Sequence, residues 1–468
     1  MSLTKPSMDL ALVDGKYDII SIRNHFMNGG VLSIQSAVTL IQRVRQLLQN
    51  EPNLISVNGD VLIFGDFHGQ FFDFLTEIED FEWNRTPHKT IFLGDYVDRG
   101  IYSCELLFML MSMKYNSPTE VLMLRGNHET RKMTVKWGFH NECIWKYNNE
   151  IYNEIMTVFD ALPLAVIVSS TYGDFFLSHG GLSKSMTRVE EISRINRFKE
   201  PPKEGLFCDL LWSDPVSVEY FEMHPEMVEH WEEITYVENI VRNCSYMYGH
   251  KAVTSFQLNN KITSVIRGHQ YTEKGIQMHF FGEEQVGTPL VFTLFSAPNY
   301  SKGNLGAGMI IKRNGIQVRT YTSSKLKEVY RPTLVNAFRV TTQCITMALN
   351  NFITDFIYYT FQGHFDLQDD DKLNVTSLVN SVNGRGKSVL SKRGKNIGGS
   401  TPMKRKRLFA SSSSATEHKN TKKRGTLVSS IATEVPSKYE PTKIREETLP
   451  MSLTELRKTW TETETAQQ

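Results

Sequence analysis

The sequence is poor in cysteine and has no excess charge of either sign, and each shortage removes a class of protein. Its 468 residues include five scattered cysteines, none in a Cys-x-x-Cys pair: Cys104, Cys143, Cys208, Cys244 and Cys344. Neither a disulfide framework nor a cysteine zinc site is expected, and free thiols in a reducing compartment are the simpler reading. A formal net charge of +1 gives no general attraction to nucleic acid or to anionic membranes.

Long apolar runs are also missing. No uninterrupted run approaches the roughly 20 residues that a membrane span requires, and residues 1–10 contain no apolar stretch of the secretory kind. We therefore expect no membrane span and a cytoplasmic location. The basic run KRKR at 404–407 leaves a nuclear location open, although a solvated basic tail explains it equally well.

The chain does contain a series of short apolar runs, each of which ends in a polar, glycine-rich turn. The runs occupy residues 61–64, 91–93, 121–124, 175–177 and 265–266. Their length is typical of buried strands, and intervening stretches such as 103–114 and 149–159 have helical character. This alternation predicts an α/β domain, which ends after a strand-like segment at 309–321. Because α/β proteins place their chemistry at the carboxyl ends of strands, the turns are the candidate site.

Composition divides the chain further. We predict a flexible N-terminus (1–15), a catalytic domain (16–325), a linker (326–335), an amphipathic helix (336–362) and a basic, mostly disordered tail (363–468). Six large apolar side chains share one face of the helix: Ile345, Leu349, Phe352, Ile353, Phe356 and Ile357. That face either packs on its own domain or docks another protein. The tail has too few large apolar residues to offset its ordering entropy.

The polar turns supply the ligands of a two-metal site. The candidates are Asp66, His68, Asp95, Asn127, His179 and His269. Mixed nitrogen and oxygen ligands suit Zn, Fe or Mn better than Ca or Mg. Two ions about 3.5–4 Å apart need a bridging carboxylate together with ligands private to each ion, and this set provides both.

Other residues of the turns suit a phosphate ester. Arg99 lies four residues after Asp95, and guanidinium recognises phosphate through a fork of two donors. His128 follows Asn127 directly and can protonate a leaving alkoxide, with Asp98 as the carboxylate that orients its imidazole. The combination predicts a metal-dependent phosphoesterase.

Three of these turns resemble the signature motifs of the PPP family of serine/threonine protein phosphatases: GDFHG, GDYVDRG and GNHE at 65–69, 94–100 and 126–129. Later landmarks match as SHGGL, RGHQ and LFSAPNY at 178–182, 267–270 and 294–300, so that the resemblance covers about residues 18–325. Within the family, the segments 197–202, 208–215 and 241–248 are similar to the calcineurin catalytic subunits.

The resemblance implies a metallophosphoesterase fold, an α/β architecture with a central β-sandwich flanked by helices. It implies one metal on Asp66, His68 and Asp95, and a second on Asp95, Asn127, His179 and His269. It also implies phosphate binding by Arg99, Arg242 and Asn127, a general acid in His128 paired with Asp98, and a cleft lined by Tyr300. The implied reaction is hydrolysis of phosphoserine and phosphothreonine in proteins by a hydroxide that an Fe/Zn or Mn pair activates.

Calcineurin-like partners are implied as well. They are phosphoprotein substrates and an EF-hand regulatory subunit of the calcineurin B kind, bound to the helix at 336–362 and linking the enzyme to calcium signalling. Substrate peptides would dock by strand addition on Gln317, Val318 and Arg319. The tail shows no convincing amphipathic basic helix for calmodulin, so calmodulin control stays open. Ser183-Lys184 and the loop at 299–304 depart from the family pattern, and inhibitor sensitivity is therefore not assumed.

Two other functions compete with this interpretation. A nucleotide phosphodiesterase or nuclease also uses Asp-His and Asn-His pairs on two metals, but the GDYVDRG and LFSAPNY segments disfavour it. A catalytically inactive scaffold would have lost a ligand, Arg99 or His128, and none of these is replaced. A protein phosphatase remains the favoured function.

Overall fold

The computed structural model describes residues 6–81, 89–281, 289–301, 303–313 and 315–326, together with Leu349 and Ile353. Residues 327–335 of the predicted linker lie outside the described residues, as do the rest of the predicted helix and the basic tail. The boundaries between these segments therefore stay a prediction. Leu349 and Ile353 are helical and expose 55% and 39% of their surface. No helix among the described residues has the length and apolarity needed to cross a bilayer.

The N-terminal segment forms short strands, where the sequence predicted a flexible stretch up to residue 15. Strand β1 (Ser7–Met8) pairs in parallel with β4 (Val31–Leu32), and β2 (Leu12–Val13) pairs with β3 (Lys16–Tyr17). The backbone of Leu10 also donates to the Ser36 hydroxyl over 2.9 Å. Two-residue strands carry no periodicity, which is why pattern analysis missed them.

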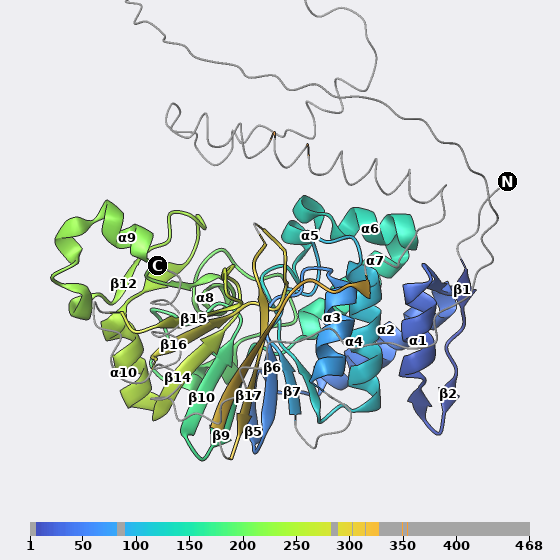
Figure 1. Ribbon diagram of the computed structural model, residues 1–468, viewed down its shortest axis with the longest axis horizontal. Helices are drawn as coiled ribbons and strands as arrows, with labels where there is room; N and C mark the ends of the chain where they lie inside the picture. The colour runs from blue at the N-terminus through green and yellow to red at the C-terminus, as the bar shows by residue number, and fades with distance from the viewer. Residues whose placement is uncertain are drawn as a thin grey trace, which may run out of the picture. The chain divides into compact units, whose positions relative to one another are not determined.

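Two mixed sheets form the centre of the catalytic domain (Figure 1). The five-stranded sheet has the order β18 (Gly315–Tyr321), β17 (Gly306–Lys312), β6 (Val61–Phe64), β7 (Lys89–Phe92) and β8 (Val121–Met123). The six-stranded sheet has the order β15 (Ile276–His279), β16 (Val291–Leu294), β14 (Ile262–Arg267), β10 (Gly173–Ser178), β9 (Ala165–Ser170) and β5 (Leu54–Asn58). Strands β6, β7 and β8 are parallel, as are β10, β14 and β16.

Successive side chains of each strand point to opposite faces of its sheet, so that a hydrophobic core forms on both faces. Ile63 of β6 and Leu177 of β10 lie in one core that draws its residues from both sheets. Phe64 of β6 packs into a second core with helices, and Phe176 of β10 packs into a third. The predicted central sandwich flanked by helices is therefore confirmed.

Helices cover both outer faces of the sandwich (Figure 1). The five-stranded sheet is covered by α1 (Ile19–Met27), α2 (Ile34–Gln49), α3 (Phe71–Asp80), α4 (Ser103–Asn116), α6 (Phe139–Lys146) and α7 (Asn149–Ala161). The six-stranded sheet is covered by α8 (Leu206–Trp212), α10 (His250–Asn260) and the 3-10 turn η1 (Val189–Arg194). The helices expected at 103–114 and 149–159 are α4 and α7. The segment at 309–321 forms the two antiparallel strands β17 and β18, with Lys312 opposite Gly315, rather than one strand.

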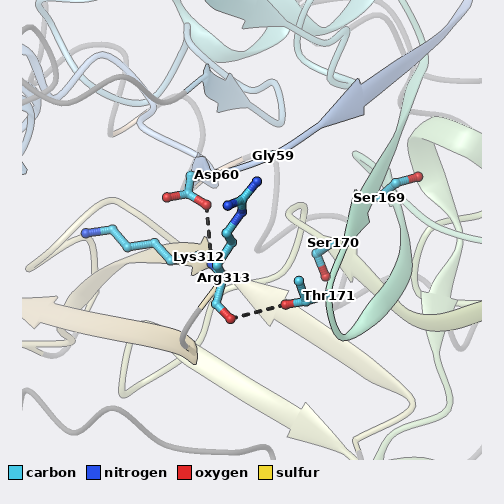
Figure 2. A pocket seen from close by; sticks show the side chains of 7 residues that line it. All are labelled: Gly59, Asp60, Ser169, Ser170, Thr171, Lys312 and Arg313. Atoms are coloured by element: carbon cyan, nitrogen blue, oxygen red, sulfur yellow. Dashed lines mark hydrogen bonds between the residues drawn. The ribbon is translucent and has the colours of Figure 1, made fainter.

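A shallow cavity of about 200 Å³ lies where β6 and β10 begin, at the opposite end of these strands from the polar turns (Figure 2). It is lined by Gly59, Asp60, Ser169, Ser170, Thr171, Lys312 and Arg313. The hairpin residue Arg313 is pinned there, because its N–H donates to Asp60 and its carbonyl accepts from Thr171. Histidine is absent from this lining and Asp60 is its single carboxylate, so the cavity is not the metal site.

Candidate metal centre

The predicted ligands converge at the carboxyl ends of five strands. Asp66, Asp95, Asn127, His179 and His269 follow β6, β7, β8, β10 and β14. The ligand atoms of His68, Asp95 and His128 lie within 4.8 Å of one another, and so do those of Asp95, His179 and His269. All of these side chains are buried. Asp95 belongs to both groups, which is the position that a bridging carboxylate requires.

The turns reach this position through strained backbone. Five site residues have left-handed φ angles between 46° and 72°: His68, Asp95, Asp98, Arg99 and His269. Such conformations are costly for residues other than glycine and cluster at functional sites. Gly94 itself has φ of +110°, and a Cβ placed on it would lie 2.4 Å from the Gly126 nitrogen. The turns carrying Asp95 and Asn127 therefore pack backbone against backbone.

Carbonyl groups fix the tautomers of two histidines. Nδ1 of His68 lies 3.1 Å from the Val97 carbonyl, and Nδ1 of His179 lies 3.1 Å from the Leu93 carbonyl. A carbonyl oxygen only accepts, so Nδ1 carries the proton and Nε2 keeps its lone pair. This arrangement presents Nε2 of both rings to the centre, as in metal-bound histidines.

Ring nitrogens of His179 and His269 face oxygen atoms across the centre. Nε2 of His179 lies 3.3 Å from Asp95 Oδ1 and 2.9 Å from Asn127 Oδ1, and Nδ1 of His269 lies 2.9 Å from the same Asn127 oxygen. Turning the Asn127 amide would let its nitrogen donate to Asp95 instead. With its oxygen turned inward, the same amide would offer an oxygen ligand to a metal ion.

Buried atoms without partners complete the fit to metal ions. Among the described residues, Asp66 Oδ2 and His269 Nε2 have no hydrogen-bond partner. Burial, followed by the neighbouring Asp95, raises the pKa of Asp66 to about 7, and burial lowers the pKa of His68 to about 3. Although burial opposes it, Asp95 raises the pKa of His179, whereas the neutral His68 ring brings no positive charge to these crowded carboxylates. The residues present fit two metal ions that share Asp95.

The predicted acid pair is formed. Nδ1 of His128 lies 2.7 Å from Asp98 Oδ2, while its Nε2 is 4.0 Å from Asp95 Oδ2. The other Asp98 oxygen accepts from the Phe139 N–H over 2.9 Å. Burial lowers the pKa of His128 to about 4 and raises the pKa of Asp98 well above its usual range. Because Asp98 occupies Nδ1, the nitrogen of His128 that can reach a bound substrate is Nε2.

The residues expected to bind phosphate lie around this centre. Arg99 is exposed and its guanidinium carbon lies 3.3 Å from the centroid of the Trp137 ring. Arg242, between β12 (Tyr236–Glu238) and β13 (Tyr246–Tyr248), donates to the His269 carbonyl over 3.4 Å. The Tyr300 ring stacks on His68 with centroids 5.3 Å apart.

Two buried carboxylates that support the site were missed in the sequence. Glu129 accepts from the backbone of Asp95, Tyr96 and Gly126 over 2.7, 2.9 and 2.9 Å. It thereby joins the turns after β7 and β8. Asp214 in β11 (Asp214–Pro215) accepts from Arg242 Nε over 2.9 Å and from Arg267 over 3.0 Å. Apart from Gly126, their partners lie far away in sequence, so no spacing pattern signals the contacts between turns.

The predicted docking residues lie apart from the metal centre. Gln317, Val318 and Arg319 belong to β18, which ends the order of the five-stranded sheet, and each is partly exposed. Of the predicted partner-binding helix, only Leu349 and Ile353 are described; Ile345, Phe352, Phe356 and Ile357 lie outside the described residues.

The fold agrees with comparisons to known proteins. The family described as calcineurin-like phosphoesterase matches residues 59–273. The chain is 37% identical over 307 residues to serine/threonine-protein phosphatase 2B catalytic subunit A1 of Saccharomyces cerevisiae, covering 65% of this chain and 54% of that protein. The chain thus spans about half the length of that relative, and also of subunit A2, of which it covers 52%.

A second relative is covered almost completely. The chain is 36% identical over 310 residues to the serine/threonine-protein phosphatase 4 catalytic subunit of Saccharomyces cerevisiae, covering 65% of this chain and 91% of that protein. A solved protein serine/threonine phosphatase of the same yeast, with similarity to human phosphatase PP5, superimposes with a TM-score of 0.56 at 28% identity, over 66% of this chain and 94% of that one. The chain therefore belongs to the PPP family of serine/threonine protein phosphatases.

Proposed function

We propose that the chain hydrolyses phosphoserine and phosphothreonine in proteins. The observation that carries this proposal is the pair of buried groups of potential ligands that share Asp95, one of which includes His128, together with the 2.7 Å contact between His128 and Asp98. The six predicted ligands suit an Fe/Zn or Mn pair, because they combine imidazole nitrogen with carboxylate and amide oxygen. Such ions, when bound, lower the pKa of a coordinated water and withdraw charge from phosphoryl oxygens.

The chain's own residues then divide the remaining work. Arg99 and Arg242 bind the phosphoryl oxygens through paired N–H donors, and Asn127 assists from within the centre. Asp214 holds Arg242 in place, because it accepts from Nε over 2.9 Å and from Nη2 over 3.4 Å. Developing charge on the phosphoryl group is thereby met by fixed donors.

The leaving oxygen receives its proton from His128. Asp98 lies 2.7 Å from Nδ1 of this imidazole, so that in the protonated ring Nε2 is the nitrogen that donates to the serine or threonine oxygen. Tyr300, stacked on His68, lines the cleft beside them. Loss of His128 should therefore slow the step in which the leaving group departs, without removing a metal ligand.

A substrate comparison tests the proposal. The metal-loaded chain is given a phosphoserine peptide, a phosphothreonine peptide and a cyclic nucleotide at equal concentrations. We expect turnover of the two peptides and little of the cyclic nucleotide. Preferred cleavage of the cyclic nucleotide would instead favour a phosphodiesterase.

A calcineurin-like regulatory subunit is the proposed partner. The exposed apolar side chains of Leu349 and Ile353 support it, since an EF-hand protein binds such a helical face. This partner would connect the enzyme to calcium signalling in the cytoplasm. Leu349→Asp with Ile353→Asp should abolish co-purification with a calcineurin-B-like protein, whereas Leu258→Asp, at an exposed leucine of α10, should not. Retention by the double variant would count against the partner.

Peptide docking on β18 is the proposed route to substrate choice. Within the described residues β18 pairs only with β17, so its outer edge can accept an added strand. Val318→Glu should weaken peptide binding, with Gln277→Glu on the edge strand β15 as the matched control. Equal peptide affinity in the two variants would remove docking at this edge.

A further inference from the structure

Trp137, the last residue of α5 (Arg131–Trp137), contacts the arginine that is proposed to bind phosphate. The guanidinium carbon of Arg99 lies 3.3 Å from the centroid of its ring, well inside the range of cation–π attraction. The N–H of Arg99 also donates to the Trp137 carbonyl over 3.3 Å. The tryptophan is buried, with 9% of its surface exposed, whereas Arg99 is exposed. A fixed aromatic surface thus supports a side chain that faces solvent.

The residues after Trp137 hold the same turn from a second side. The Phe139 N–H donates to Asp98 over 2.9 Å, and Gly138 joins α5 to α6 with φ of +120°. Asp98 and Arg99 have φ of 72° and 67°, so this turn is strained and depends on such contacts. The junction between α5 and α6 therefore fixes the backbone of the turn as well as its guanidinium.

We propose that Trp137 is a positioning residue for phosphate recognition, holding the Arg99 guanidinium in place before substrate arrives. The inference rests on the proposed function and deepens it. An exposed arginine samples many rotamers, and ordering them on binding weakens affinity. Stacking on the indole orders the side chain in advance.

The indole N–H adds a second clue. Nε1 of Trp137 is buried and has no hydrogen-bond partner among the residues that the structure describes. A buried donor without a partner destabilises the fold, so the indole contributes here through its face, over which Arg99 and, at 4.6 Å, Lys136 Nζ lie. A phenylalanine would keep a weaker face without the unpaired donor.

The test uses the full, metal-loaded chain with Trp137→Leu and Trp137→Phe. We measure kcat and KM for a phosphoserine peptide, inhibition by inorganic phosphate, and phosphate binding by calorimetry. Trp137→Leu should raise KM and weaken phosphate binding about tenfold with kcat changed less than about threefold, because ground-state and transition-state contacts weaken together. Trp137→Phe should weaken phosphate binding about two- to threefold. The control is Trp231→Leu, whose ring packs on His250, and it should match the wild type.

The outcomes distinguish failure of this inference from failure of the proposed function on which it rests. Phosphate binding unchanged in Trp137→Leu, at native metal content, would overturn the positioning role. If Trp137→Leu does not fold, Trp137→Phe decides, and phosphate binding as tight as in the wild type would overturn the role. Absence of phosphopeptide turnover in the wild type would refute the proposed function, while calorimetry with phosphate would still test Trp137.

Discussion

Replacement of Glu129 by glutamine should destabilise the protein more than its small chemical change suggests. The carboxylate is fully buried, and its two oxygens accept three backbone N–H groups from the turns after β7 and β8. Glutamine offers one acceptor oxygen, so at least one buried N–H would face an NH₂ group. A hydrogen bond of this kind contributes about 0.5–1.5 kcal/mol, and an unsatisfied buried donor costs about 1–3 kcal/mol. We expect a loss of about 2–4 kcal/mol in the free energy of unfolding.

The assay is urea unfolding of the metal-loaded protein, followed by tryptophan fluorescence. Glu120→Gln is the matched control, since that carboxylate is about half exposed and should change stability by less than about 0.5 kcal/mol. Metal affinity of Glu129→Gln should also fall about 10- to 100-fold, because the turns bearing Asp95 and Asn127 lose their common support. Stability and metal affinity equal to those of Glu120→Gln would refute the reasoning.

Three further predictions concern the site and its surroundings. Asp214→Asn removes the charge that holds Arg242 and Arg267, so inhibition by inorganic phosphate should weaken about tenfold; unchanged inhibition would contradict this. Chelation should lower the melting temperature, and Mn²⁺ but not Ca²⁺ should restore it; equal rescue by both ions would argue against a mixed nitrogen and oxygen site. Burial lowers the pKa of His279 to about 3, so the neutral ring stabilises the fold above the unfolded pKa of about 6.5, and this stability is lost as the pH falls. Between pH 7 and pH 5 the wild type should therefore lose about 2 kcal/mol more of its free energy of unfolding than His279→Gln does. Equal losses in the two proteins would rule this out.

The sequence predicted the parts of the fold that have strong local patterns. The run at 61–64 is β6 with the same bounds, and the helices at 103–114 and 149–159 extend only slightly, as α4 and α7. The hairpin of β17 and β18 was predicted as one strand, because the two strands follow one another closely in the sequence, with Lys312 opposite Gly315. Period and composition therefore locate elements better than they locate the turns between them.

The site was predicted unevenly for a similar reason. Its ligand candidates stand next to apolar runs, so position in the sequence marks them. Arg242 follows no such run, and only the family resemblance indicated it. Glu129, Asp214 and Trp137 act through contacts with backbone, guanidinium groups or an exposed side chain from other segments. Contacts of this kind depend on the folded chain and leave no local pattern.

Metal content and phosphopeptide turnover, measured together on the wild type and on His128→Asn, test the central claim most directly. We predict two metal ions per chain in both proteins, because His128 is assigned to proton transfer and not to metal binding. Turnover by His128→Asn should fall about 100- to 10,000-fold, as expected when a general acid is lost. Two bound metals without turnover by the wild type, or full turnover by His128→Asn, would contradict the account.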